Sequence, residues 1–521
     1  MLYELHSLSE SKLQKLFTLL GALIACQTIY IQHGWINDDS VLYFEVARLF
    51  SAGEWKQGFA LYNWSFYSVI LSLVNQLTSL SIQTSAQILN IIFFAITTFS
   101  FIHLIRLSGG GKSTIIYGAV LLLSSGYIVG DILPMLLRDQ GFWAAFLTAL
   151  IFYIQFYRSK KLREALLWQV CMIIAMLFRV EAITFLIGMP IALFLNREIS
   201  TRQNFKYFFI INSISIAAFI GILSLLFFVP SIHLSDFGRL QEAVIIFPRM
   251  MSEIAHSFQL KAGIMNEQIL GSLLNEYGMI GIILTLIGII FLKTIGLISW
   301  PVAGICALRF TVKRACTPTK IRQDSYNILL WALALALVNA CFILASVFVL
   351  SGRYIISLGF ILLILIAFYI SPLIDSQLAH SLSKQKKLIL LALVISISLS
   401  GIGNLIPKGE GYNYEQEAVA YLKQQQVADS KVFYVSARVR YHANAPYAGR
   451  DNDYWKLTKD AINDGSINSY DYLLLNLRVD KSNPKQEKAL TDQLTQFKVI
   501  KEFYGYKKKK KVMIFAKEKS S

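Results

Sequence analysis

The chain has 521 residues, of which 55% are hydrophobic and only 16% are charged, and its mean hydropathy is +0.53. Soluble chains average about 25% charged residues, so this composition excludes a soluble enzyme, a disordered protein and a nucleic-acid-binding protein. The apolar residues gather in blocks of roughly 15–25, the length that crosses about 30 Å of hydrocarbon. The sequence therefore predicts a polytopic α-helical membrane protein, and the net charge of +17 is expected to collect largely in cytoplasmic loops.

About 11 apolar blocks (a range of 10–12) are expected to form transmembrane helices. The first, at 16–32, is too long for a signal-peptide core and lacks a small-residue cleavage site, so we interpret it as a retained signal anchor. The others lie near 86–105, 114–131, 141–157, 165–178, 182–195, 207–230, 278–298, 327–350, 354–371 and 388–406.

The distribution of basic residues predicts the orientation. With a cytoplasmic N-terminus, cytoplasmic segments hold 19 Lys and Arg residues of the membrane part, and the external segments hold 8. This asymmetry is typical of membrane proteins, and it places the C-terminus outside.

Two apolar stretches need a separate interpretation. A span at 62–80 would invert every later loop, so we interpret this stretch as an interfacial or re-entrant helix on the outer face. The stretch 278–310 is too long for one span and contains Lys293, so we expect one span followed by an interfacial helix.

From Pro407 onward the chain loses its apolar blocks and becomes rich in charge. A helix is expected at 415–426, and β-branched and aromatic residues predict strands at 431–437, 471–479, 499–506 and 512–516. We therefore expect a transmembrane domain at 1–406, with external loops at 33–85 and 231–277, and a small external α/β domain at 407–521. Five cysteines lie in spans or on the cytoplasmic side, which excludes an external disulfide within the chain: Cys26, Cys171, Cys306, Cys316 and Cys341.

The first candidate site directly follows the first span. Asp38 and Asp39 precede a segment whose apolar residues have helical spacing and which is expected to stop at Gly53. Asp39 is either a helix cap or a general base just above the membrane, and the two roles are compatible.

A second group of charges lies between two later spans. Arg138 and Asp139 are either ordinary interface anchors, or a phosphate ligand and an orienting carboxylate. Asp131 is the alternative candidate for orienting an acceptor or a metal.

Two further arginines interrupt apolar sequence at or near membrane depth. Arg179 and Glu181 form either a structural ion pair or part of a phosphate site, because charges at this depth usually face a protein cavity. Arg353, followed by Tyr354, is either a snorkelling loop residue or a second anion contact.

Three other patterns carry no predicted site. The run 109–114 resembles part of a phosphate-binding loop, but Arg106 occupies the place of its first glycine and no soluble strand precedes it. The seven histidines lack metal-ligand spacing. The run Lys507–Lys511 is expected at a hairpin tip, where contact with anionic lipid headgroups is an alternative.

The first loop resembles that of the GT-C membrane glycosyltransferases, in which an acidic residue after span one begins the pattern Asp-x3-Tyr-x3-Ala followed by Gly and Trp. The likeness is nearest to the bacterial branch that is protein O-mannosyltransferase-like, aminoarabinose-transferase-like and glycosyltransferase family 39-like. The matching residues are Asp39, Tyr43, Ala47, Gly53 and Trp55.

Two departures from this family pattern concern the base and the acceptor. Many relatives have Asp-Glu where this chain has Asp39-Ser40, so the second carboxylate is either Asp38 or absent. The common Pro-Pro-Leu-Tyr run is reduced to Ala60-Leu61-Tyr62.

The resemblance implies a membrane glycosyltransferase of the bacterial cytoplasmic (inner) membrane, with its active site and C-terminal domain on the periplasmic or extracellular side. Its donor is a polyprenyl-phosphate sugar, its acceptor a glycan, lipid or protein, and no nucleic acid or nucleoside triphosphate takes part. No cofactor is firmly implied, and a divalent metal remains open. The expected base is Asp39 or Asp38, the expected phosphate ligands are Arg138, Arg179 and Arg353, and the expected acceptor or orienting residues are Asp139, Asp131, Tyr43, Glu181 and Tyr354.

Two other functions remain as alternatives. A transporter or flippase of lipid-linked glycan often has internal repeats and charges at mid-membrane, whereas the charges here cluster at one face and no repeat is visible. A non-catalytic subunit of a glycan-assembly complex would keep the scaffold without the chemistry.

Overall fold

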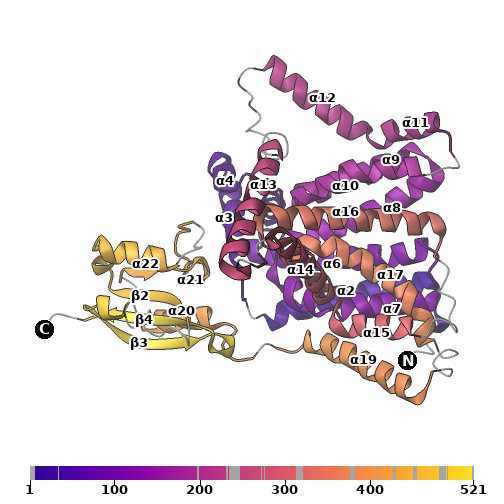
Figure 1. Ribbon diagram of the computed structural model, residues 1–521. Helices are drawn as coiled ribbons and strands as arrows, with labels where there is room; N and C mark the ends of the chain where they lie inside the picture. The colour runs from indigo at the N-terminus through magenta and orange to yellow at the C-terminus, as the bar shows by residue number, and fades with distance from the viewer. Residues whose placement is uncertain are drawn as a thin grey trace. The chain divides into compact units, whose positions relative to one another are not determined.

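A computed structural model of the 521-residue chain divides into two compact units (Figure 1). The membrane unit comprises Met1–Thr28 and Ala86–Leu405, and the α/β unit comprises Ile29–Ser85 and Ile406–Ser521. The first loop and the C-terminal tail, far apart in sequence, thus share one unit. The structure describes residues 6–32, 34–195, 199–229, 231, 233, 247–271, 273–274, 276–311, 321–375, 382–407, 409–425, 430–449, 454–479, 489 and 491–518.

Within these residues, 8 helical segments are long and apolar enough to cross a membrane, which confirms the predicted polytopic helical architecture. The pair α11 (Thr201–Ile211) and α12 (Ser213–Phe228), bent by 62°, adds a ninth when it is counted as one broken span. The eight are α2 (Glu10–Ile31), α6 (Ile82–Leu107), α7 with its following turns (Lys112–Met135), α8 (Asp139–Ser159), α14 (Gly278–Ile298), α16 (Gln323–Val347), η8 with α17 (Gly352–Ile374) and α19 (Lys384–Gly403).

The expected count of 11 is higher because two of the predicted blocks form shorter helices. Block 165–178 is α9 (Leu162–Phe178), which has 17 residues, or about 25 Å. Block 182–195 consists of η3 (Val180–Ala182), α10 (Ile183–Gly188) and η4 (Met189–Leu195). The two segments meet at Arg179, whose extended backbone (φ −142°, ψ 116°) breaks the helix as the charged interruption predicts.

The two ambiguous stretches are both resolved in the described chain. Helix α5 (Phe66–Thr78) has 13 residues, about 20 Å, which is shorter than the hydrocarbon layer. Helix α14 ends at Ile298, Ser299 turns with φ +78°, and α15 (Trp300–Phe310) follows. The predicted span followed by a shorter helix is therefore confirmed.

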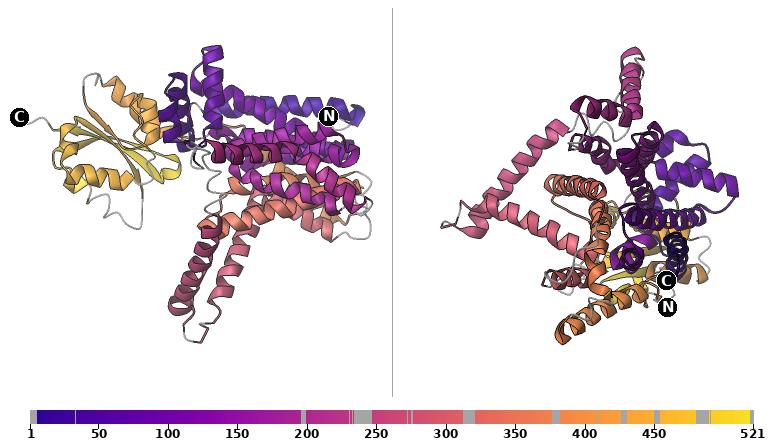
Figure 2. Two further views of the ribbon diagram at one scale, coloured as in Figure 1. Left: turned by 90° about the horizontal axis from the view of Figure 1, so that it is seen from above. Right: turned by 90° about the vertical axis from the view of Figure 1, so that its right-hand side faces the viewer.

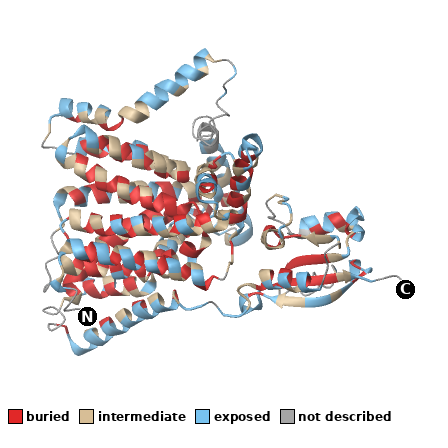
Figure 3. Cartoon of the chain, turned by 180° about the vertical axis from the view of Figure 1, so that it is seen from behind, coloured by how far each residue is buried: buried red, intermediate tan, exposed pale blue. Residues whose placement is uncertain are grey.

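The membrane unit has a buried centre and several peripheral helices with exposed apolar side chains (Figure 3). Helix α12 has no buried residue, and Phe227 and Phe228 at its end are more than 70% exposed. Exposed apolar surface of this extent is expected to face lipid. Helix α13 (Phe247–Ile264), from the predicted loop 231–277, pairs with α14 (Figure 2), and most of 230–246 lies outside the described residues. Cys316 also lies outside them, and the four described cysteines are free thiols.

The tail folds as the predicted helix and four strands, with two additional helices. The strands are β1 (Val432–Tyr434), β2 (Tyr472–Arg478), β3 (Phe497–Tyr504) and β4 (Lys510–Lys517), in the order β1-β2-β4-β3. Among the described strands, the β1–β2 pair is parallel and the β2–β4 and β3–β4 pairs are antiparallel. The predicted hairpin tip joins β3 to β4, where Lys507 and Lys508 have positive φ.

Side chains of β2 alternate between two hydrophobic cores. Leu473, Leu475 and Leu477 pack in one core with α22 (Tyr454–Asn463). Leu474 lies in the other core, against α20 (Tyr414–Gln424) and α21 (Ala437–Ala443). This period of two means that Asn476 shares the α20 face.

The first loop forms three helices: α3 (Asp38–Ser51), α4 (Trp55–Leu61) and α5. Leu42, Val46 and Phe50 form the buried stripe of α3 that the helical spacing predicts. Helix α3 ends just before Gly53, whose φ of +81° terminates it as predicted.

Acidification is expected to destabilise the α/β unit through His442. Burial lowers the pKa of this imidazole to about 4, and the nearby Arg438 and Lys423 act in the same direction. The unfolded chain has an ordinary histidine pKa of about 6.5 and therefore binds a proton first. Stability consequently falls as the pH drops from about 6.5 toward 4, by about 2 kcal/mol between pH 7 and pH 5.

The measurement is the melting temperature of the full-length protein in detergent at both pH values. The variant His442→Gln should lose less stability on acidification than the wild type. Replacement of an exposed histidine of α13, His256→Gln, should preserve the wild-type pH dependence. Identical acid sensitivity in wild type and His442→Gln would contradict the assignment.

Candidate functional site

Two consecutive helices bring Asp139 and Arg179 together. Helix α8 begins at Asp139 and α9 ends at Phe178, and the two pack as an antiparallel pair, so these ends meet. Gly141 makes the approach close, because a Cβ atom there would lie 2.3 Å from the Phe178 ring. The glycine thus allows α9 to deliver Arg179 to the start of α8.

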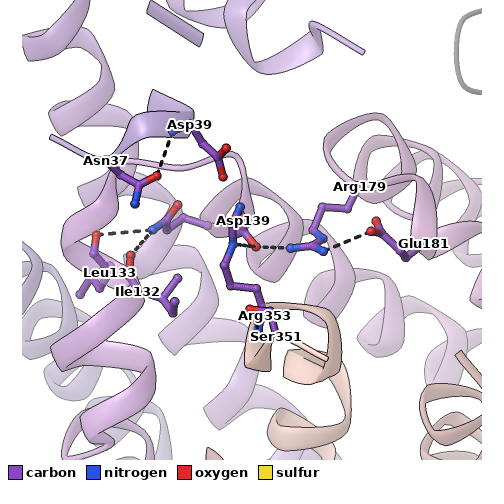
Figure 4. A network of polar contacts seen from close by, with 10 residues as sticks. Asn37, Asp39, Ile132, Leu133, Asp139, Arg179, Glu181, Ser351 and Arg353 are labelled. Carbon is purple, nitrogen blue, oxygen red and sulfur yellow. Dashed lines mark hydrogen bonds and ion pairs between the residues drawn. The ribbon is translucent and has the colours of Figure 1, made fainter. Parts of the chain in front are cut away.

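Asp139 is fully buried and accepts from arginines of two distant segments (Figure 4). One carboxylate oxygen pairs with Arg179, and the other accepts from the Arg353 guanidinium at 2.9 Å. A second Arg353 nitrogen lies 3.4 Å from the first oxygen. The carboxylate also lies in the first turn of a 21-residue helix, where the helix dipole favours negative charge.

Arg179 has further partners that hold its guanidinium in place. It donates to Glu181 at 3.2 Å, and its guanidinium carbon lies 4.9 Å from the centre of the Tyr354 ring. Arg138 is close enough to interact electrostatically with both Asp139 and Glu181. The structure therefore gathers five predicted residues around Asp139: Arg138, Arg179, Glu181, Arg353 and Tyr354. We call these six residues the arginine cluster.

An irregular backbone leads into the cluster. A π-helical segment, η1 (Gly126–Ile132), is followed by a 3₁₀ turn, η2 (Leu133–Met135), and then by Leu136 with a φ of +52°. Such conformations are costly for a branched residue and concentrate at functional sites. Gln140 donates to the carbonyl of Ile132 at 3.0 Å and holds this segment against α8. Asp131 lies in η1 and is exposed.

The segment that carries Arg353 is fixed by a close contact. Gly352 packs against Tyr127, and a Cβ atom at Gly352 would come within 2.3 Å of the Tyr127 hydroxyl oxygen. Tyr127 also hydrogen-bonds Ser351. Residue 352 must therefore be small if the adjacent Arg353 is to reach Asp139.

The arginine cluster holds three cations against two carboxylates, an excess of one positive charge if all are ionised. Arg179 is almost wholly buried, whereas the side chains of Arg353 and Glu181 are 22% and 16% exposed. The cluster thus has a buried, tightly paired part and an open edge, where Arg353 and Glu181 are partly exposed.

In the α/β unit the structure separates the roles of the two consecutive aspartates. Asn37 is the N-cap of α3, and its side chain accepts from the Asp39 backbone nitrogen at 3.0 Å (Figure 4), so the capping role expected for Asp39 belongs to Asn37. Asp38 pairs with Arg438 of the tail at 3.1 Å. Asp39 is partly exposed. Tyr43 is only 2% exposed and packs against Tyr62 and Tyr67 of the same loop.

No group of three His, Cys, Asp or Glu residues with metal-binding geometry occurs in the described part of the chain.

Sequence reasoning missed residues that act by shape or by long-range pairing. Gly141 and Gly352 lie beside the predicted charges but carry no side chain, and Tyr127 is four positions from the nearest charge, so the sequence gives no sign of the contacts they make. Arg438 is one of many basic residues in the tail, so its pairing with Asp38 has no signal in the sequence.

The sequence matches no protein-family model and no curated protein. The chain is similar to the structure of the arabinofuranosyltransferase AftD from Mycobacteria, with 13% identity and a TM-score of 0.47 over 98% of this chain and 42% of AftD. It is also similar to the structure of the oligosaccharyltransferase AglB from Archaeoglobus fulgidus, which was solved with an inhibitory peptide and a dolichol-phosphate. The identity is 11% and the TM-score 0.48 over 98% of this chain and 74% of AglB. A third similar structure is that of ArnT from Cupriavidus metallidurans, with 13% identity and a TM-score of 0.39 over 96% of this chain and 97% of ArnT.

These neighbours are GT-C-fold glycosyltransferases, the superfamily that the first loop resembles. The chain spans 42% of the length of AftD. Because all three TM-scores are below 0.5, the likeness decides neither the activity nor the site residues, and those rest on the geometry of the chain itself.

Removal of the buried carboxylate should destabilise the membrane unit strongly. Asp139→Asn leaves Arg179 and Arg353 without their shared anion, and breaking a buried pair typically costs about 3–5 kcal/mol. The measurement is the thermal midpoint of the purified protein in detergent.

The matched control is Glu45→Gln, which breaks an ion pair with Arg48 whose arginine side chain is 58% exposed. Exposed pairs contribute at most about 1 kcal/mol, so its midpoint should stay near that of the wild type. Equal midpoints for Asp139→Asn and Glu45→Gln would show that the buried pairing does not stabilise the unit.

Proposed function

We propose that this protein is an integral membrane glycosyltransferase that moves a sugar from a polyprenyl-phosphate carrier to an acceptor on the outer face of the cytoplasmic membrane. The observation that carries the proposal is the arginine cluster, which holds an excess cation at the ends of apolar helices and opens at Arg353 and Glu181. Charges in such places are costly and are usually functional.

The cluster suits a phosphate whose lipid tail lies in the bilayer. Guanidinium groups bind phosphate oxygens through paired N–H donors. Asp139 holds Arg179 and Arg353 in fixed positions, so little ordering is needed when the ligand binds. The same cations then stabilise the second negative charge that develops when the phosphate leaves.

Asp39 is the proposed general base. Asp39 is partly exposed in the first turn of α3 and fills the place of the acidic residue in the first-loop pattern, which supports it for the chemical role. Asp39 takes the proton from the acceptor hydroxyl as that oxygen attacks the anomeric carbon. The bond between this carbon and the phosphate oxygen breaks, and polyprenyl phosphate departs with the electron pair. The configuration at the anomeric carbon inverts.

This mechanism predicts unequal effects of two isosteric substitutions. Asp39→Asn should abolish glycan transfer, whereas Asp38→Asn should retain measurable transfer. A strain that lacks the gene is complemented with each variant, and its lipopolysaccharide, capsule and glycoprotein glycans are compared with those of the wild type. Immunoblotting confirms equal membrane levels. Restoration of wild-type glycans by Asp39→Asn would disprove the assignment of the base.

The open-edge arginine should determine the affinity for the donor. Arg353→Ala is expected to raise the KM for a polyprenyl-phosphate sugar by about 10–100-fold, because a charge-assisted contact to phosphate contributes about 1.5–3 kcal/mol. Arg353→Lys should recover part of the loss. The control Arg48→Ala removes an exposed arginine of the first loop and should leave the KM unchanged. An unaltered KM in Arg353→Ala would contradict the phosphate role.

A further inference from the structure

The α/β unit contains an ion-pair network that joins the first loop to the tail. Arg438, in the first turn of α21, has its Nε atom 3.1 Å from an Asp38 oxygen at the start of α3. The same nitrogen lies 2.9 Å from Glu415 of α20, and a terminal nitrogen donates to that carboxylate at 3.0 Å. One guanidinium therefore connects two carboxylates that are 377 positions apart in the chain.

The Glu415 side of the network is anchored in the core of the tail. Glu415 is 3% exposed and accepts from Asn476 of β2 at 2.6 Å, on the sheet face that α20 covers. The Asp38 side chain, at the other end, is 55% exposed. The rigid end of the network thus lies in the sheet, and the end that it restrains is the first turn of α3.

Aromatic contacts from the tail support α3 beyond this first turn. The Tyr441 hydroxyl donates to Gln83 at 2.8 Å, and its ring centre lies 6.0 Å from that of Phe44. Tyr447 packs against the core of α3. Trp35, just before the helix, lies 5.5 Å from Tyr412. The tail therefore contacts α3 and the segments on both sides of it.

Electrostatics makes Arg438 the critical member of the network. Burial raises the pKa of Glu415, and the Asp38 carboxylate raises it further, whereas Arg438 lowers it. Without the guanidinium, the first turn of α3 would lose its ionic link to the buried Glu415 and to the sheet behind it.

From this geometry we propose that Arg438 is a positioning residue for glycosyl transfer, through which the C-terminal domain sets the orientation of the helix turn that carries Asp39. The inference rests on the proposed function, since it assigns the domain a role in placing the base. A misplacement of the base by about 1 Å can reduce a rate by about 100-fold.

The test combines hydrogen exchange with complementation, using the full-length protein in detergent micelles and the gene-deletion strain. In Arg438→Gln, amide exchange in the first turns of α3 should rise at least about tenfold, while β2 and β4 keep wild-type protection. The glycan restored by this variant should fall by about 10–100-fold, and Arg438→Lys should recover part of both losses.

The matched control is Arg440→Gln, which removes the same charge from the same helix. Arg440 donates to the carbonyls of Tyr434 and Pro446 within the tail, so exchange in α3 should stay at the wild-type level. Asp38→Asn changes the exposed end of the ion-pair network and leaves the core of the tail intact. The double variant Asp38→Asn/Arg438→Gln should show no more exchange in α3 and no less glycan than Arg438→Gln, because both changes break the same Asp38–Arg438 ion pair.

Unchanged exchange in the α3 turns of Arg438→Gln would overturn the inference, as would loss of protection across β2 and β4, which would indicate a merely structural role. Additive losses in the double variant would also overturn it. Exchange does not require substrate, so increased exchange in α3 without any glycan phenotype in Asp39→Asn would disprove the proposed function while retaining the link between the tail and α3.

Discussion

A carboxylate that is fully buried among apolar helices needs cations from the protein, and Asp139 obtains them from Arg179 and Arg353. The three residues come from α8, from the break after α9, and from the turn before α17. The pairing therefore ties together the ends of segments that are up to 214 positions apart. Isolated charge at this depth is costly, so these ends must meet if the chain is to fold with its charges ionised.

The local backbone is shaped by this requirement. Gly141 lets the Phe178 ring lie against α8, and Gly352 lets Tyr127 lie against the turn that carries Arg353. The π-helical segment and the left-handed Leu136 place the chain for the start of α8. Each feature carries a local conformational or packing constraint, and together they hold the buried Arg179 and the partly exposed Arg353 in fixed positions. Preorganised charge of this kind is what stabilisation of a leaving phosphate requires.

A comparable arrangement occurs in the α/β unit, where Arg438 lies between Asp38 and the buried Glu415. In both units an arginine connects segments that are distant in sequence, and in both one of its carboxylate partners is buried. The first loop and the tail form one compact unit, and the aromatic contacts of Tyr441 and Tyr447 give α3 a support that a loop of 13- and 14-residue helices would otherwise lack.

The sequence by itself determined the elements whose signal is local. Apolar length identified the membrane helices, the charged interruption at Arg179 marked a helix break, and β-branched and aromatic residues located β2 and β4. It also singled out Arg138, Asp139, Arg179, Glu181, Arg353 and Tyr354, because charged or aromatic residues beside long apolar segments are conspicuous. Two of its predicted blocks form apolar helices that are shorter than the others in the described chain: α9 and the segment from Val180 to Leu195.

Only the tertiary structure decided which of these residues meet. Nothing in the sequence pairs Asp139 with Arg353, assigns Asp38 to Arg438, or gives the cap of α3 to Asn37 in place of Asp39. Hydrophobic periodicity constrains each segment separately, whereas an ion pair depends on where the segments end in space and on side chains small enough to let them approach. For that reason the kinds of residue at the site could be read from the sequence, and their partners could not.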